Sequence, residues 1–215
     1  VLFPTQGLGH ALITDYDYAV AIAQAYNDWL YNYFLKESPR LLGVALLPMQ
    51  RVDAAVAELR RAVTELGMVG GVLPAVTLAG KGYGEPEFHP LWAEAERLDV
   101  PLVTHGGSSA QLGLDLLHNF TVGHTLEHPF AQMRHLASML FEGVFERFPK
   151  LRFGYLECGA GWLPYLMDRM DEEIERKAKY SPNCKRKPSE YLRAGNIYVT
   201  AEVEEGTLPF VLDYI

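Results

Sequence analysis

Long apolar runs, cysteines and excess positive charge are all scarce in this 215-residue sequence. No run approaches the roughly 18 consecutive apolar residues that indicate a membrane-spanning helix, so we expect no contact with a membrane. The two cysteines, Cys158 and Cys184, are too few for the disulfide framework of a small secreted domain. Together these absences predict a cytoplasmic protein in a reducing compartment.

Several signature motifs are also absent. The sequence has no P-loop, no G-x-S-x-G elbow and no G-x-G-x-x-G after a candidate strand, which argues against the common nucleotide-binding and serine-hydrolase sites. The 19 basic and 27 acidic residues give a net charge of −8, which repels phosphate backbones and excludes nucleic acid as an expected partner. A hydrophobic content of 49% excludes general disorder. We therefore expect a globular protein whose partner is a small molecule.

Short apolar runs alternate with segments of helical spacing along the whole chain. The runs are typical of strands buried on both faces, and such an alternation predicts a parallel sheet covered by helices. The predicted strands are 1–3, 41–47, 69–73, 100–104, 152–156 and 197–200. The predicted helices between them are 16–34, 52–66, 90–98, 130–148 and 163–177. Without a dinucleotide fingerprint, the closed (β/α)8 barrel is favoured over the open doubly wound sheet.

The count of strands indicates an incomplete barrel. Six strands are predicted where eight are needed, so we expect the first and last βα units to be missing and the chain to be a fragment. The first residues also lack the basic segment of a signal peptide. No linker divides the sequence, so residues 1–215 are expected to form one barrel domain. Exposed strand edges in such a domain favour a homo-oligomer.

Two ionisable residues directly follow predicted strands. In a (β/α)8 barrel the chemistry is carried at the carboxyl ends of the strands. His105 follows the fourth strand and precedes Gly106 and Gly107, which leave room for a sharp turn and a substrate. Glu157 follows the next strand, so the two side chains are expected to be neighbours. The alternatives are a hydrogen-bonded structural histidine and a carboxylate paired with an arginine.

The other histidines are harder to place. His124 and His128 have the spacing H-x-x-x-H, but Pro129 disfavours helix at the residue before it. We therefore predict that both lie in a long loop, 107–128, that walls a pocket. His135 is predicted to lie on the surface of the following helix.

Other polar residues near the strand ends carry weaker signals. Glu202 follows the last predicted strand, but Glu204 and Glu205 make that segment resemble a solvated loop. Cys158 adjoins Glu157, and the alternation of a strand end directs its side chain elsewhere. A small core residue is the favoured interpretation of this cysteine.

Five phrases of the sequence resemble the amidohydrolase-related, metal-dependent TIM-barrel family that includes aminocarboxymuconate-semialdehyde decarboxylase and the resorcylate decarboxylases. The resemblance runs nearly end to end, and its most specific part is the phrase around residues 145–151. The phrases are Tyr26-Asn27-Asp28-Trp29-Leu30, Pro90-Leu91-Trp92, Thr104-His105-Gly106-Gly107, the stretch from Gly143 to Leu151, and Pro188-Ser189-Glu190-Tyr191-Leu192.

The resemblance implies a single divalent metal, commonly zinc, with manganese or iron as alternatives. In that family the ligands are a His-x-His pair on the first strand, a His on the fifth and an Asp on the eighth. His105 matches the fifth-strand ligand, and the other ligands are expected before Val1 and after Ile215. In the decarboxylases a His ends the sixth strand and handles the proton, whereas this sequence has Glu157 there.

The hypothesis from the sequence is a metal-dependent decarboxylase or hydrolase acting on a small carboxylate, lactone or amide. His105 would bind the metal, which polarises the substrate and activates water. Glu157 and His128 are the candidate catalytic residues. Gly106, Gly107 and His124 are the candidate substrate-binding residues. The alternative hypothesis is a non-catalytic barrel that binds a small ligand or partner after losing its metal site.

Overall fold

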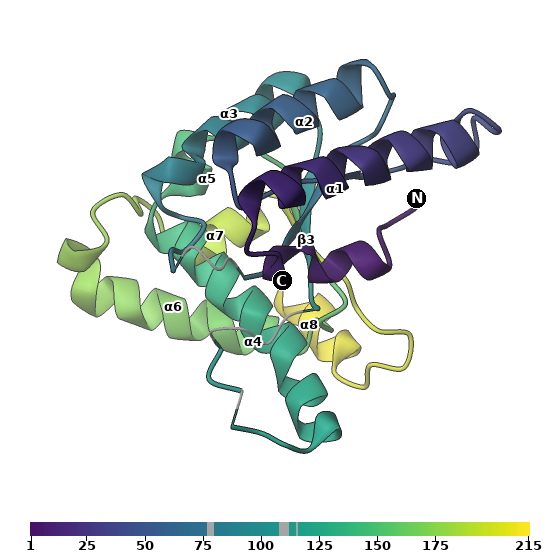
Figure 1. The fold of residues 1–215 in the computed structure, drawn as a ribbon. Coiled ribbons are helices and arrows are strands. Elements are labelled where there is room, and N and C mark those ends of the chain that lie inside the picture. Colours follow the sequence, from purple (N-terminus) through teal and green to yellow (C-terminus); the bar gives the residue numbers. More distant parts are fainter. Residues whose placement is uncertain (77–79, 108–111, 115) are drawn as a thin grey trace.

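The centre of the molecule is a parallel sheet (Figure 1). The computed structural model describes residues 1–76, 80–107, 112–114 and 116–215. Within these residues, five strands follow one another in sequence order, and each is hydrogen-bonded in parallel to the next. They are β1 (Ala45–Leu46), β2 (Gly71–Pro74), β3 (Leu102–His105), β4 (Phe153–Leu156) and β5 (Ile197–Val199). Leu2 makes an isolated parallel bridge to Gly43, so five of the six predicted strands are strands of the sheet and the first, 1–3, contributes this single bridge.

Helices connect successive strands and pack outside the sheet. Helices α1, α2 and α3 lie side by side (Figure 1), with α1 and α2 packed on β1 and α4 packed on β3. The α-helices are α1 (Tyr16–Leu30), α2 (Val52–Thr64), α3 (His89–Leu98), α4 (Phe120–Phe141), α5 (Val144–Arg147), α6 (Leu163–Lys177), α7 (Pro188–Arg193) and α8 (Leu208–Tyr214). Shorter helical turns are η1 (Gln6–Leu12), η2 (Tyr31–Leu35), η3 (Pro86–Phe88) and η4 (Ala178–Tyr180). No helix in the described ranges is long and apolar enough to cross a lipid bilayer.

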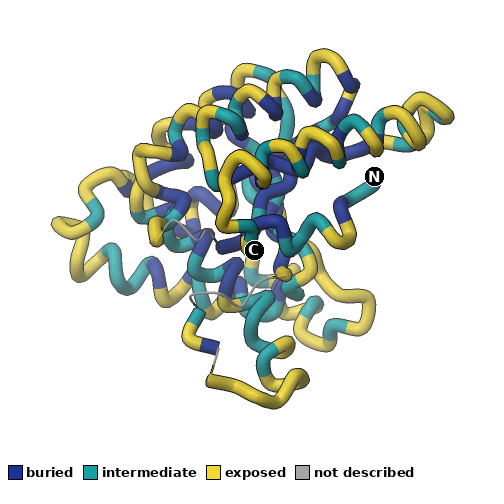
Figure 2. Tube along the Cα trace, in the orientation of Figure 1, coloured by how far each residue is buried: buried dark blue, intermediate teal, exposed yellow. Residues whose placement is uncertain are grey.

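The core lies between the strands and the inner faces of the helices, and the outer helix faces are exposed (Figure 2). Its largest side chains are aromatic, with Trp92, Phe88 and Phe153 all fully buried. Phe153 from β4 packs edge to face on Trp92 from α3, with ring centroids 6.0 Å apart. Such pairs add to the stability gained from burial alone. This packing joins the helix before β3 to the strand after it.

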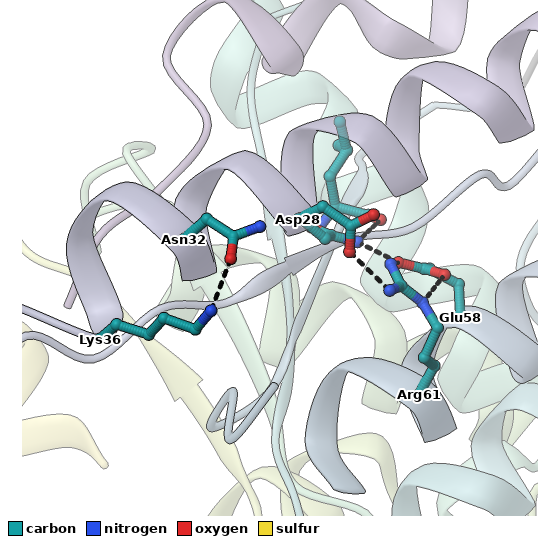
Figure 3. A network of polar contacts seen from close by, with 7 residues as sticks. Asp28, Asn32, Lys36, Glu58 and Arg61 are labelled. Carbon is teal, nitrogen blue, oxygen red and sulfur yellow. Dashed lines mark hydrogen bonds and ion pairs between the residues drawn. The ribbon is translucent and has the colours of Figure 1, made fainter. Parts of the chain in front are cut away.

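A buried polar network ties α1 and α2 to β1 (Figure 3). Asn27 donates to the Leu46 carbonyl oxygen at 3.1 Å and accepts from the Leu46 N–H at 2.8 Å, so its amide pairs with the strand as a neighbouring backbone would. Asn27 also donates to Glu58 at 2.7 Å. Arg61 then bridges Glu58 and Asp28, which compensates the buried carboxylate. This network accounts for the Asn27-Asp28 phrase noted in the sequence.

Helix α4 departs from the sequence prediction. It begins at Phe120, about three turns before the predicted start, and Pro129 lies inside it. The Asn119 side chain starts the helix by accepting from the N–H groups of Thr121 and Val122. The predicted loop 107–128 is therefore wrong at its carboxyl-terminal end, while residues 108–111 and 115 lie outside the described residues. Gly143, at φ +75°, separates α4 from α5 within the segment predicted as one helix.

The inner face of α4 carries the buried polar side chains of His135 and Gln132. His135 is 2% exposed, so the prediction of a surface histidine is wrong. Its Nδ1 lies 3.1 Å from the Tyr155 hydroxyl. Gln132, on the same face, bonds Thr104 through its side-chain oxygen at 2.5 Å and the Leu156 carbonyl oxygen through its amide nitrogen at 3.2 Å. Partners on the strands satisfy Gln132 and the Nδ1 atom of His135, as buried polar groups require.

Candidate metal centre

His105 and Glu157 meet at the carboxyl ends of two adjacent strands. His105 is the last residue of β3, opposite Leu156 of β4, and Glu157 follows one residue later. His105 Nε2 lies 2.6 Å from Glu157 Oε2. The side chains are 16% and 57% exposed, so the carboxylate reaches toward solvent while the imidazole stays inside. Their proximity is what the order of the parallel strands predicted.

A hydrogen bond at the other ring nitrogen of His105 fixes the orientation of the imidazole. His105 Nδ1 lies 2.7 Å from the Gly106 carbonyl oxygen, which can only accept a hydrogen bond, so Nδ1 carries the proton. This bond turns Nε2 toward Glu157. Metal-binding histidines commonly have one nitrogen held by a backbone carbonyl in this way, and a cation would take the place of the contact between Nε2 and Glu157.

The backbone at Glu157 has an unusual conformation. Its φ is +53°, in the left-handed region that side-chain-bearing residues rarely adopt. The Glu157 N–H donates to Thr200 Oγ1 at 3.0 Å, which helps to hold the turn. Strained residues of this kind concentrate at functional sites, where surrounding contacts maintain them.

His128 reaches the same place from α4. Its side chain is 12% exposed. A Cβ atom at Gly106 would lie 2.0 Å from His128 Cδ2, so only glycine at this strand end admits the ring. Ligand atoms of His105, His128 and Glu157 all lie within 4.8 Å of one another.

These three groups fit a divalent metal. Two imidazoles and a carboxylate are ligands that zinc and manganese accept, and a catalytic zinc site commonly has three protein ligands. The ligand atoms of a tetrahedral zinc site, with bonds of about 2.0–2.1 Å, lie about 3.4 Å apart. The observed spacing is close enough for side-chain adjustment to bring the three groups onto one ion.

A cavity of about 580 Å³ opens beside His128 and Glu157. His124 also lines it, one helical turn from His128, and the ring centroids of the two histidines are 5.0 Å apart. Of the two glycines predicted to bind substrate, Gly106 is buried against His128, and Gly107, at φ +138°, faces Leu8.

The cavity is also lined by residues that the sequence analysis had set aside. Glu202, Glu204 and Glu205 follow β5 and form part of its wall. Their position after a strand was the available signal, but the run of acidic residues suggested a solvated loop. Cys158 also lines the cavity and is only partly buried. Burial raises the pKa of its thiol to about 12, so it is a poor nucleophile at neutral pH.

This fold and site define the class of protein. The chain belongs to the amidohydrolase family, because the family model described as Amidohydrolase matches residues 4–214. The resemblance inferred from the sequence is therefore confirmed.

Two proteins with sequences similar to this chain are decarboxylases. A gamma-resorcylate decarboxylase from Rhizobium sp. (strain MTP-10005) is 33% identical over 166 residues, which cover 74% of this chain and 50% of the relative. A 2-amino-3-carboxymuconate-6-semialdehyde decarboxylase from Dictyostelium discoideum is 28% identical over 153 residues, covering 71% of this chain and 42% of the relative. The chain thus spans about half the length of the curated relatives it matches.

Solved structures confirm the fold class. A dihydroxybenzoic acid decarboxylase from Polaromonas sp. JS666, with bound manganese and the inhibitor 2-nitroresorcinol, matches with a TM-score of 0.82 and 27% identity over 94% of this chain and 64% of that one. An amidohydrolase from Mycobacterium avium subsp. paratuberculosis K-10 matches with a TM-score of 0.85 and 25% identity, covering 99% of this chain and 56% of that one. The chain therefore has the fold of part of a TIM barrel.

Proposed function

We propose that this chain forms the metal-binding part of a decarboxylase or hydrolase of the amidohydrolase family. The convergence of His105, His128 and Glu157 within 4.8 Å, beside an open cavity, carries this proposal. A divalent cation at that position supplies Lewis acidity, which polarises a substrate oxygen and lowers the pKa of a bound water. Zinc and manganese both suit this donor set.

The three residues have different roles in the proposed site. His105 and His128 are the less exposed groups, and each offers one imidazole nitrogen to the cation. Glu157 has two carboxylate oxygens, so it can contact the cation with one and exchange a proton with the substrate through the other. His124 lies farther along the cavity wall, where it can contact the rest of a substrate.

We propose a small aromatic carboxylate as the substrate. The support is the similarity to a gamma-resorcylate decarboxylase and to a dihydroxybenzoic acid decarboxylase. In decarboxylation the bond from the ring to the carboxylate would break to release carbon dioxide, and a proton would take its place on the ring carbon. Glu157 would relay that proton, taking it up from water and passing it to the ring. Hydrolysis of a lactone or amide uses the same groups, with Glu157 accepting a proton from water. The cytoplasmic location and the homo-oligomeric state stay predictions from the sequence.

Metal titration of the purified 215-residue chain tests the site directly. We expect one equivalent of Co²⁺ or Mn²⁺ to bind, and His105→Ala and His128→Ala to weaken binding at least tenfold. His118→Ala is the matched control, because His118 is exposed and does not line the cavity. Release of carbon dioxide from 2,6-dihydroxybenzoate, with and without a chelator, then tests decarboxylation. A chain that binds no divalent cation, or that binds it equally well without His105, contradicts the proposal.

A further inference from the structure

Glu205 holds the loop that follows β4. It lies between β5 and α8, and its carboxylate accepts hydrogen bonds from the backbone of a segment 45 residues earlier. The Ala160 N–H lies 2.9 Å from both Glu205 oxygens, and the Gly161 N–H bonds Oε1. One side chain thus joins the loops after two adjacent strands, and the first of these loops begins with Glu157.

The Glu205 carboxylate is also fixed from its own side. It accepts from the Glu202 N–H at 3.2 Å and from Thr207 Oγ1 at 3.0 Å. Burial by itself raises the pKa of Glu205, but the hydrogen bonds from backbone N–H groups and from Thr207 outweigh it and lower the pKa. Glu205 is therefore ionised at neutral pH, and hydrogen bonds to an ionised acceptor are stronger than those to a neutral one.

Other contacts restrain the rest of the same loop. Trp162 Nε1 bonds the carbonyl oxygens of Cys158 at 3.1 Å and Gly159 at 2.8 Å. A Cβ atom at Gly161 would lie 2.4 Å from Thr207 Oγ1, so glycine permits the close approach of the two loops. Polar groups along residues 157–161 thus have partners, and those of Ala160 and Gly161 depend on Glu205.

We propose that Glu205 is a positioning residue that holds the 157–161 turn, and through it the Glu157 carboxylate, beside His105 and His128. This inference rests on the proposed metal site. Glu205 contacts backbone N–H groups and the Thr207 hydroxyl rather than the candidate ligands, so it acts by fixing the position of Glu157. Outer groups that orient metal ligands commonly contribute 10- to 100-fold to metal affinity.

Glu204 provides a matched control for Glu205. Both glutamates line the cavity, and they are adjacent in sequence. Glu204 is exposed and makes no hydrogen bond or ion pair to any residue that the structure describes. Replacing either one by glutamine removes one negative charge from the cavity wall. Only the Glu205 replacement disturbs an acceptor for the 157–161 turn.

The first measurement compares metal binding by Glu205→Gln and Glu204→Gln in the 215-residue chain. We expect Glu205→Gln to weaken Co²⁺ binding at least tenfold and to change the visible absorption spectrum of the bound ion, which reports on ligand geometry. Glu204→Gln should bind within about twofold of the parent and keep its spectrum. Equal affinities and spectra for the two variants would overturn the proposal.

The second measurement needs no metal. Hydrogen exchange followed by mass spectrometry should show exchange at residues 157–161 at least tenfold faster in Glu205→Gln, and unchanged in Glu204→Gln. If the parent chain binds no Co²⁺ while this difference appears, the proposed function fails and the holding role of Glu205 stands. Unchanged exchange in Glu205→Gln would refute the holding role. If Glu205→Gln does not fold, Glu205→Asp, which keeps the charge on a shorter side chain, is measured with the same expectations.

Discussion

The buried imidazole of His135 should make the fold sensitive to acid. His135 lies among Tyr83, Phe153 and Tyr155, and within the described residues its Nε2 has no hydrogen-bond partner. Burial, with a further contribution from the charge of Arg134, lowers the pKa of His135 to about 3. The ring therefore stays neutral in the folded protein and becomes protonated when the chain unfolds in mild acid.

The size of the change in unfolding free energy follows from the pKa values of His135 in the folded and unfolded states. An unfolded histidine titrates near 6.5, so the unfolded state binds the extra proton as the pH falls below that value. The contribution of His135 to stability is fully present above pH 6.5 and is lost as the pH falls from there toward 3. Each pH unit in that window costs about 1.4 kcal/mol, which gives about 2 kcal/mol between pH 7 and pH 5.

Urea unfolding at pH 7, 6 and 5 measures this effect. We expect His135→Phe to lose about 2 kcal/mol less unfolding free energy than the parent between pH 7 and pH 5. Phenylalanine suits the aromatic surroundings, and any cost from the lost Tyr155 contact is independent of pH over this range. His118→Phe, at an exposed position, should keep the slope of the parent. If His135→Phe and the parent lose stability in parallel, the buried neutral imidazole is not the cause and the reasoning fails.

Three further expectations follow from particular contacts. Asn27→Ala should lower the free energy of unfolding in urea by about 3 kcal/mol, because it leaves buried backbone groups of β1 unpaired. Asn32→Ala, at an exposed site, should change it by less than about 0.5 kcal/mol. Similar values for the two variants would contradict the network. Gly106→Ala should weaken Co²⁺ binding at least tenfold by displacing the nearby histidine ring, while Gly123→Ala, whose Cβ would meet no atom within 4 Å, should leave it unchanged. Equal binding by both variants would show that the ring does not need this space. Cys158, with its raised pKa, should react with iodoacetamide at pH 8 far more slowly in the folded chain than in the chain unfolded by guanidinium. Mass spectrometry follows the reaction. Equal rates in the two states would refute the raised pKa.

The strands were predictable because each is a short apolar run between turn residues. Five of the six predicted positions are strands of the sheet and the first makes one parallel bridge, and helix α6 begins and ends where its spacing indicated. The predicted start of helix α4 was wrong for a physical reason. The residue before a proline usually avoids helical geometry, yet here Asn119 starts the helix well before Pro129 and packing against β3 keeps it continuous.

The site residues also divide into those that the strand order alone brings together and those that depend on tertiary packing. His105 and Glu157 could be paired in advance, since parallel strands that follow one another place their carboxyl ends together. His128 was a candidate catalytic residue from the sequence, but its place beside the His105 ring could not be predicted, because it depends on α4 and on the absence of a side chain at Gly106.

The hydrogen bonds of Glu205 could not be predicted from its neighbours in the sequence. Its partners lie about 45 residues away in sequence, and a run of acidic residues looks the same whether its carboxylates are solvated or bound by backbone N–H groups. Local periodicity describes which segments are buried, but it does not describe which backbone groups a buried loop leaves unpaired. Those groups must find acceptors somewhere in the fold, and in this chain the acceptor for the loop after β4 comes from the loop after β5. A strand-end carboxylate in an unfavourable backbone conformation is therefore a reason to search the neighbouring strand's loop for the group that holds it.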